Sequence, residues 1–283
     1  MKNREDGGEK SKGRRFPQLL LWSGGIALTL LFLLGIANLL APHAVQRLLS
    51  GAAPTPTPTP TPSPPKAAIL DQTGVTNPCP DFIEEVSDLL TEGGFEVEVH
   101  PWEELSVDFY RTLPGRGYRL ILFQTHSTSE VAAPGGEDLS EEYPPGPFIF
   151  TGEQASNKYL FERVHDRIRR AWFLYGDFPP FFAIGPEFVR SSMSGTFPDT
   201  VIIIGGCESL AVPDLAQALL ERGASVVIGW DGLVDLSHNN KAMLHLLQAL
   251  VVDGLSPYEA VEETMEAVGP DPTYGSALAV RTR

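Results

Sequence analysis

The sequence predicts an α/β fold, a three-layer sandwich with helices on both faces of a mostly parallel sheet. Three observations lead to this prediction. From residue 66 onward, short apolar runs recur along the 283-residue chain. Stretches with the apolar spacing of a helix lie between these runs, and glycine or other turn residues separate the two kinds of segment. The first 65 residues differ in composition, so one folded domain is expected at 66–283.

The N-terminal region predicts a membrane anchor. Residues 1–18 form a basic tail, and 19–41 are almost wholly apolar. As a helix, 19–41 would measure ~35 Å, which is enough to cross a bilayer. The positive charges before it predict a cytoplasmic N-terminus and an outward-facing domain, at the cell membrane. A cleaved signal peptide is the alternative. Residues 42–65 are the predicted linker, and within them 54–65 alternate proline with threonine or serine, which predicts an extended polyproline-type spacer.

The domain's elements are predicted from their apolar spacing. The β-branched and alternating runs predict strands at 67–70, 95–99, 118–125, 148–151, 201–204, 224–230 and 276–280. Amphipathic stretches predict helices at 81–92, 103–113, 157–172, 213–222 and 238–253, and a last helix capped by Ser256. Residues 127–198 are rich in proline and are predicted to consist mainly of loops.

Charge and composition exclude several kinds of partner. Residues 1–65 hold seven Lys or Arg against three Asp or Glu, so the other 218 residues carry −19 of the net charge of −15. So acidic a domain argues against nucleic-acid binding. No phosphate-binding glycine loop is present, and no cofactor is expected. His238 and His245 share a predicted helix but lack a third ligand, so no metal site is predicted.

The candidate chemistry starts at Cys207. This cysteine follows the apolar run 201–204 and two glycines, Gly205 and Gly206. In open α/β sheets, ligands bind beside the carboxyl ends of such strands. A free cysteine is often buried and inert, so the position by itself leaves both interpretations open. A disulfide to Cys79, the other cysteine, would remove the nucleophile.

His126 is the second candidate, because it too follows an apolar strand. If both strands belong to one parallel sheet, His126 and Cys207 lie on the same edge, and neighbouring strands are ~4.8 Å apart. A histidine beside a cysteine favours the nucleophilic thiolate. The backbone N–H groups of Ser127 and Gly206 are predicted to hold the oxyanion of an acyl intermediate. Together these residues predict a Cys-His dyad.

The order of these motifs resembles the caspase-like (clan CD) cysteine peptidases, most closely their bacterial CHAT-type members. A hydrophobic strand that ends in histidine recurs at 121–127, and a strand that ends in a small residue and cysteine recurs at 202–207. A helix, Gly-Ala and a strand ending in Gly-Trp follow at 215–230, and the segment 254–261 resembles the terminal helix. Cys207-Glu208-Ser209 is also similar to the Cys-Glu-Ser of legumains.

The resemblance covers roughly 66–280 and implies a caspase-like sheet and peptide-bond hydrolysis. It departs at Ser127, where the family has glycine. It also implies a specificity pocket drawn from Trp230 and the segment that follows, in which Asp231 and Asp235 would select a basic residue before the cleaved bond. The preferred alternative is that Asp231 forms a turn with Gly232, and Glu208 is either a pocket acid or a solvated residue.

Three functions remain open from the sequence. The first is a membrane-anchored, extracytoplasmic cysteine peptidase in which Cys207 attacks and His126 transfers the proton. The second is a catalytically inactive domain of the same fold that binds a peptide or an envelope component. The third is a cysteine hydrolase that acts on another acyl group. Ser127 in place of glycine favours the second function over the first, whereas the paired strand ends favour the first.

Overall fold

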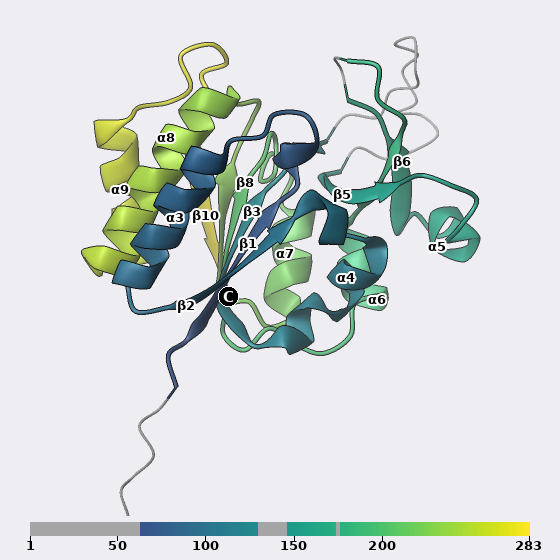
Figure 1. Cartoon of the computed structure of the whole chain (residues 1–283), viewed down its shortest axis with the longest axis horizontal. Coiled ribbons are helices and arrows are strands. Elements are labelled where there is room, and N and C mark those ends of the chain that lie inside the picture. Colours follow the sequence, from purple (N-terminus) through teal and green to yellow (C-terminus); the bar gives the residue numbers. More distant parts are fainter. Residues whose placement is uncertain (1–62, 130–145, 174–175) are drawn as a thin grey trace, which may run out of the picture. The chain divides into compact units, whose positions relative to one another are not determined.

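A six-stranded sheet forms the centre of the folded domain (Figure 1). The structure is a computed structural model that describes residues 63–129, 146–173 and 176–283. They belong to one of two units, Pro62–Arg283. The strand order is β10-β9-β8-β3-β1-β2, with β10 antiparallel to β9 and the other neighbours parallel. The strands are β1 (Lys66–Asp71), β2 (Glu96–Pro101), β3 (Tyr118–Gln124), β8 (Val201–Gly205), β9 (Val226–Trp230) and β10 (Leu278–Thr282). The predicted mostly parallel sheet is therefore confirmed.

Helices cover both faces of this sheet, as the sequence predicts. One face packs against α3 (Pro80–Glu92), α8 (Leu236–Leu247) and α9 (Pro257–Ala267). The other packs against α4 (Val107–Thr112), α6 (Pro186–Ser191) and α7 (Asp214–Glu221). Along β3, Leu120 and Leu122 enter the first core and Ile121 and Phe123 enter the second. Because both faces are covered, the strand is apolar throughout instead of alternating.

The helix ends explain where most predicted boundaries fall. Ser256 and Glu259 form a capping box at the start of α9, and Asp235 accepts hydrogen bonds from two backbone N–H groups at the start of α8. The predicted helix 238–253 is continuous as α8 and a π-helical turn, η4 (Gln248–Val252). The predicted helix 103–113 is interrupted. A 3₁₀ turn, η2 (Trp102–Glu104), precedes α4, and another, η3 (Leu113–Arg116), follows it.

A second sheet, antiparallel and four-stranded, occupies the region predicted to be loops. Its order is β4-β5-β7-β6, formed by β4 (Ser127–Thr128), β5 (Phe148–Gln154), β7 (Phe181–Ile184) and β6 (Ile168–Ala171). Several of its apolar side chains join the same core as α4, α6 and α7. The strand predicted at 148–151 is confirmed and extends to Gln154. The chain passes from β3 into this sheet through Thr125 and His126, so the second sheet begins at the candidate site.

The prediction of one helix at 157–172 is wrong. Only α5 (Leu160–Val164) is helical, and β6 then pairs with β7. Tyr159 before α5 and Asp166 after it have positive φ angles of 56° and 52°, so the backbone cannot continue as an α-helix at either end of α5. The helical spacing of this stretch is overridden because the edge of β7 offers β6 backbone hydrogen bonds, a tertiary partner that local spacing does not reveal.

The predicted anchor and linker, 19–41 and 42–65, lie almost entirely outside the described residues. Among residues 63–129, 146–173 and 176–283, no helix is both long and apolar enough to span a membrane.

Candidate functional site

The candidate site lies at the carboxyl ends of β3 and β8, which are neighbouring parallel strands. Their last residues, Gln124 and Gly205, are register partners. The backbone N–H of Thr125 donates to the carbonyl of Gly205 over 3.4 Å, which continues the pairing by one step. His126 and Cys207 therefore follow strands that end side by side, which is the arrangement predicted from the sequence.

The His126 ring is anchored on the side of β1. Its Nε2 lies 2.7 Å from Oγ1 of Thr76, in the loop after β1. The same hydroxyl donates to the carbonyl of Thr73 and accepts from the amide of Asn77. Because a hydroxyl has one proton, these bonds are satisfied together when Nε2 carries the ring proton. Nδ1 then keeps its lone pair, and no described residue is hydrogen-bonded to it.

The surroundings of His126 keep its ring neutral. Phe173 and Phe150 lie edge-on to the ring, with centroids 4.9 and 6.1 Å away. Burial among such groups lowers the pKa of His126 from 6.5 to about 4. Its backbone N–H donates to Oε1 of Gln72 over 2.9 Å, which holds the turn after β3. A neutral imidazole with a free Nδ1 lone pair is the form that accepts a proton.

The Cys207 thiol is directed to the other side of the site. Its Sγ lies 3.5 Å from the carbonyl oxygen of Val234, in the loop after β9, to which the thiol donates. Burial raises the pKa of Cys207, and the charges of Glu208 and Asp271 raise it further. Within the described part of the chain, no hydrogen bond joins this thiol to His126. Both cysteines are free, so Cys79 does not block the nucleophile.

Ser127 and Gly206 join the two strand ends. The Ser127 hydroxyl donates to the carbonyl of Cys207 over 2.6 Å. A Cβ at position 206 would lie 2.4 Å from that hydroxyl oxygen and 2.7 Å from the carbonyl oxygen of Thr125, so only glycine fits here. Ser127 therefore makes a specific contact with the cysteine turn.

Glu208 holds the same turn from its other end. Its φ is +53°, an uncommon conformation for a residue with a side chain. Its Oε2 accepts from the backbone N–H of Ser129 over 2.9 Å, and its own N–H donates to the carbonyl of Gly232. The carboxylate is therefore committed to the loop after β4.

The predicted pocket residues have structural contacts of their own. Trp230 is fully buried, and its indole donates to Asn239 over 2.9 Å, so it presents no surface to a substrate. Asp231 is exposed, and its Oδ1 accepts from the backbone N–H of Ala277. Asp235 caps α8. Both aspartates are exposed, so each keeps an accessible carboxylate.

Four residues at the site were not singled out from the sequence: Gln72, Thr76, Phe173 and Asp271. Asp271 is almost fully buried and accepts from three backbone N–H groups, including that of Asp235. Gln72 and Thr76 follow β1, at the same edge of the sheet as His126. Their position after a strand was a usable signal, but nothing local distinguishes them from turn residues.

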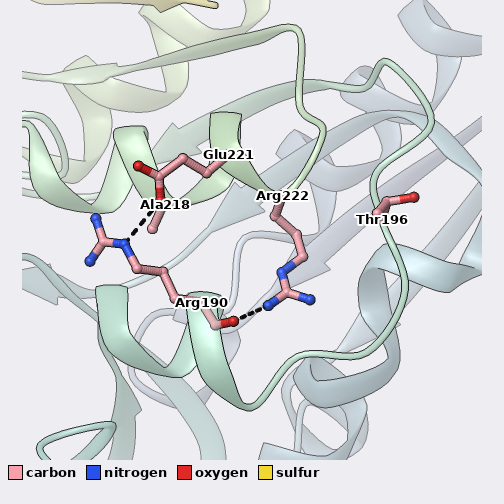
Figure 2. Close-up of a pocket in the computed structure, with 5 residues that line it drawn as sticks. All are labelled: Arg190, Thr196, Ala218, Glu221 and Arg222. Carbon is pink, nitrogen blue, oxygen red and sulfur yellow. Dashed lines mark hydrogen bonds and ion pairs between the residues drawn. The ribbon is translucent and has the colours of Figure 1, made fainter.

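A separate hollow of about 290 Å³ lies near the opposite edge of the sheet (Figure 2). It is lined by Arg190, Thr196, Ala218, Glu221 and Arg222. Both guanidinium groups already have partners: Arg190 pairs with Asp214 and Glu221, and Arg222 donates to backbone carbonyls. The hollow offers no unpaired charge to a ligand.

His238 and His245 do not form a metal site. Each is hydrogen-bonded to an oxygen atom of another residue, His238 to Gly269 and His245 to Thr264, and no metal-binding cluster occurs among the described residues.

No protein-family model matches the chain, and no curated protein is similar to it in sequence.

Proposed function

We propose that the domain is a caspase-like cysteine peptidase that hydrolyses peptide bonds with Cys207 as nucleophile and His126 as proton carrier. The observation that carries the proposal is the position of these two residues at the ends of neighbouring parallel strands whose last residues are in register. The open lone pair at Nδ1 of His126 supports it further, because a general base needs an acceptor atom that is not already occupied.

The proposed reaction starts from the neutral pair. The thiol leaves the Val234 carbonyl, gives its proton to Nδ1 of His126, and attacks the peptide carbonyl carbon. The carbon–nitrogen bond breaks as the imidazolium gives that proton to the departing amine. Water then gives a proton to Nδ1 and attacks the thioester carbonyl. The carbon–sulfur bond breaks, the acid is released, and the imidazolium returns the proton to the sulfur, which restores the thiol. The backbone N–H groups of Ser127 and Gly206 are the proposed oxyanion donors.

Acidic groups near the thiol favour a peptide with a basic residue before the cleaved bond. Glu208 and Asp271 both raise the pKa of Cys207, so a negative potential acts at the sulfur. Of the three residues predicted to contact substrate, Asp231 is the exposed carboxylate, whereas Trp230 is fully buried and the Glu208 carboxylate accepts from Ser129. A substrate cation would offset this negative potential and lower the cost of forming the thiolate.

The proposed location follows from the apolar segment 19–41. A single-pass anchor there, with the basic tail 1–18 in the cytoplasm, places the domain outside the cell membrane on its linker. No cofactor is needed by the proposed chemistry.

A second candidate function is a catalytically inactive, tethered module that binds a peptide or an envelope component. The specific observation in its favour is that the thiol and the imidazole have different hydrogen-bond partners, Val234 and Thr76. In this arrangement neither group activates the other.

Peptide cleavage by the purified full chain separates the two candidates. Cys207→Ala is expected to lower kcat/KM by about a thousandfold or more, whereas Cys79→Ala, the matched control, leaves it unchanged. Alkylation by iodoacetamide, followed by mass spectrometry, is expected to modify Cys207 and to stop cleavage. Cleavage retained in Cys207→Ala would refute the peptidase, and a full chain that binds library peptides without cleaving them would establish the binding module.

A further inference from the structure

The short helix α5 exposes large apolar side chains together. Leu160, Phe161 and Val164 are 66%, 61% and 75% exposed. The helix is nevertheless firmly seated, because Tyr159 directly before it stacks edge-on with Phe182 at 5.2 Å and donates to Glu153. Figure 1 shows α5 at the outer side of the four-stranded sheet, away from α3, α8 and α9. These apolar side chains therefore belong to a helix that is held against the four-stranded sheet by Tyr159.

Basic side chains surround this apolar group. Residues 158–171 hold five Lys or Arg against two Asp or Glu, although the domain carries a net charge of −19. Those five are more than a third of the fourteen Lys and Arg that follow residue 65. Arg163 is half-buried and makes no ion pair with a described residue, and the half-buried Arg167 lies over the ring of Phe161, with a buried Nε that has no described hydrogen-bond partner. The sign of the local charge is thus opposite to that of the domain.

From this juxtaposition we propose that α5, with Arg163 and Arg167, is a docking surface for an anionic lipid bilayer. Exposed apolar side chains beside half-buried arginines are suited to the headgroup region, where the arginines meet lipid phosphates and the apolar groups reach the acyl boundary. In a symmetric contact between the α5 faces of two copies, the arginines of the two copies would face and repel each other, whereas an anionic bilayer attracts them.

The tether expected from the sequence makes this docking feasible. The proline-rich stretch of the linker, 54–65, would extend over ~37 Å as a polyproline-type segment, so the domain can turn α5 toward the membrane. Docking through α5 would fix one orientation of the domain relative to the membrane. The docking surface is independent of the Cys207 chemistry and goes beyond the proposed peptidase.

Amide hydrogen exchange on the full chain in nanodiscs tests the proposal. Two kinds of nanodisc are compared, one of pure phosphatidylcholine and one in which phosphatidylglycerol replaces a third of it. Amide exchange of residues 158–171 is expected to be about tenfold slower in the second kind. High salt should remove the difference. Two combined variants are each expected to abolish the difference between the two lipids. One replaces the apolar side chains (Leu160→Ser, Phe161→Ser and Val164→Ser), and the other reverses the charges (Arg163→Glu and Arg167→Glu).

Tyr258→Ser is the matched control, because Tyr258 is 58% exposed on α9 beside Glu259 and should not affect exchange in α5. Unchanged exchange in β3 and β8 shows that each variant is folded. Equal exchange of 158–171 in both lipids would overturn the proposal. So would protection that depends on protein concentration and not on lipid charge, which would indicate a second copy. Peptide cleavage is expected to be the same in all these variants.

Discussion

Thr76 determines which nitrogen of His126 is available. Its hydroxyl holds Nε2 at 2.7 Å and leaves Nδ1 without a described partner. An imidazole that turned freely about its side-chain bonds would present either nitrogen to the thiol. Thr76 is therefore a positioning residue for His126.

Thr76→Val is expected to destabilise the domain and to lower kcat with little effect on KM. Valine has a similar shape but leaves Nε2 without its partner, which costs ~1–2 kcal/mol of unfolding free energy. Urea unfolding and peptide-cleavage kinetics measure the two effects. Thr76→Ser should restore both, and Thr91→Val, the same substitution at an exposed position on α3, should change neither. A Thr76→Val protein with wild-type kcat would contradict the positioning role.

His126 is also expected to make stability depend on pH. Its pKa is about 4 in the folded protein and ordinarily 6.5, so the unfolded chain binds more protons between these values. The free energy of unfolding should therefore be fully retained above pH 6.5 and fall as pH approaches 4, by at most about 3 kcal/mol. Denaturant titrations of wild type and His126→Gln isolate this contribution from that of the carboxylates. Parallel pH curves for the two proteins would argue against a buried, neutral His126.

At the scale of single residues, the sequence predicted the two reactive side chains but not their partners. His126 and Cys207 could be placed because each follows an apolar strand. Thr76 and Val234 act through one hydroxyl and one backbone carbonyl, and their contacts span 50 and 27 positions. Such contacts depend on how neighbouring loops are folded, which no local pattern encodes.

Among the elements, β5 shows how closely the two sheets are joined. Gly152 in β5 lies so near η2 that a Cβ there would be 1.7 Å from the carbonyl oxygen of Trp102. The N–H of Gly152 donates to the carbonyl of Leu105 over 2.8 Å in the same region. A glycine is therefore required where the second sheet meets the segment after β2.

Gly152→Ala is expected to lower the unfolding free energy by ~3 kcal/mol or more, since the backbone must move to admit the methyl group. Thermal and urea unfolding measure the loss. Gly115→Ala is the matched control, because a Cβ at Gly115 would meet no atom within 4 Å. If the two variants were equally stable, the close approach of β5 to η2 would be disproved.

The elements also show where sequence patterns fail. The long, periodic helices and the apolar strands of the main sheet were predicted with small errors at their ends. The region from β4 to α6 was not, because its strands are short and obtain their stability by pairing with each other. β6 had a helical spacing and still became a strand beside β7.

Across the whole molecule, charge is unevenly distributed. The acidic domain concentrates five basic residues within 158–171, around the exposed side chains of α5. The candidate site is at the carboxyl edge of the main sheet, near Glu208 and Asp271. If both proposals hold, one surface orients the domain on the membrane while the other receives a basic peptide segment.

Local patterns in the sequence were enough to predict the α/β class, the mostly parallel central sheet and the two strand ends that carry His126 and Cys207. This was possible because buried strands and amphipathic helices leave local periodic patterns. Three features became visible only in the folded structure: the imidazole contacts Thr76, the thiol contacts Val234, and a second sheet continues from β3. These features result from pairings between distant segments, in which the available partner, and not the local sequence, selects the conformation.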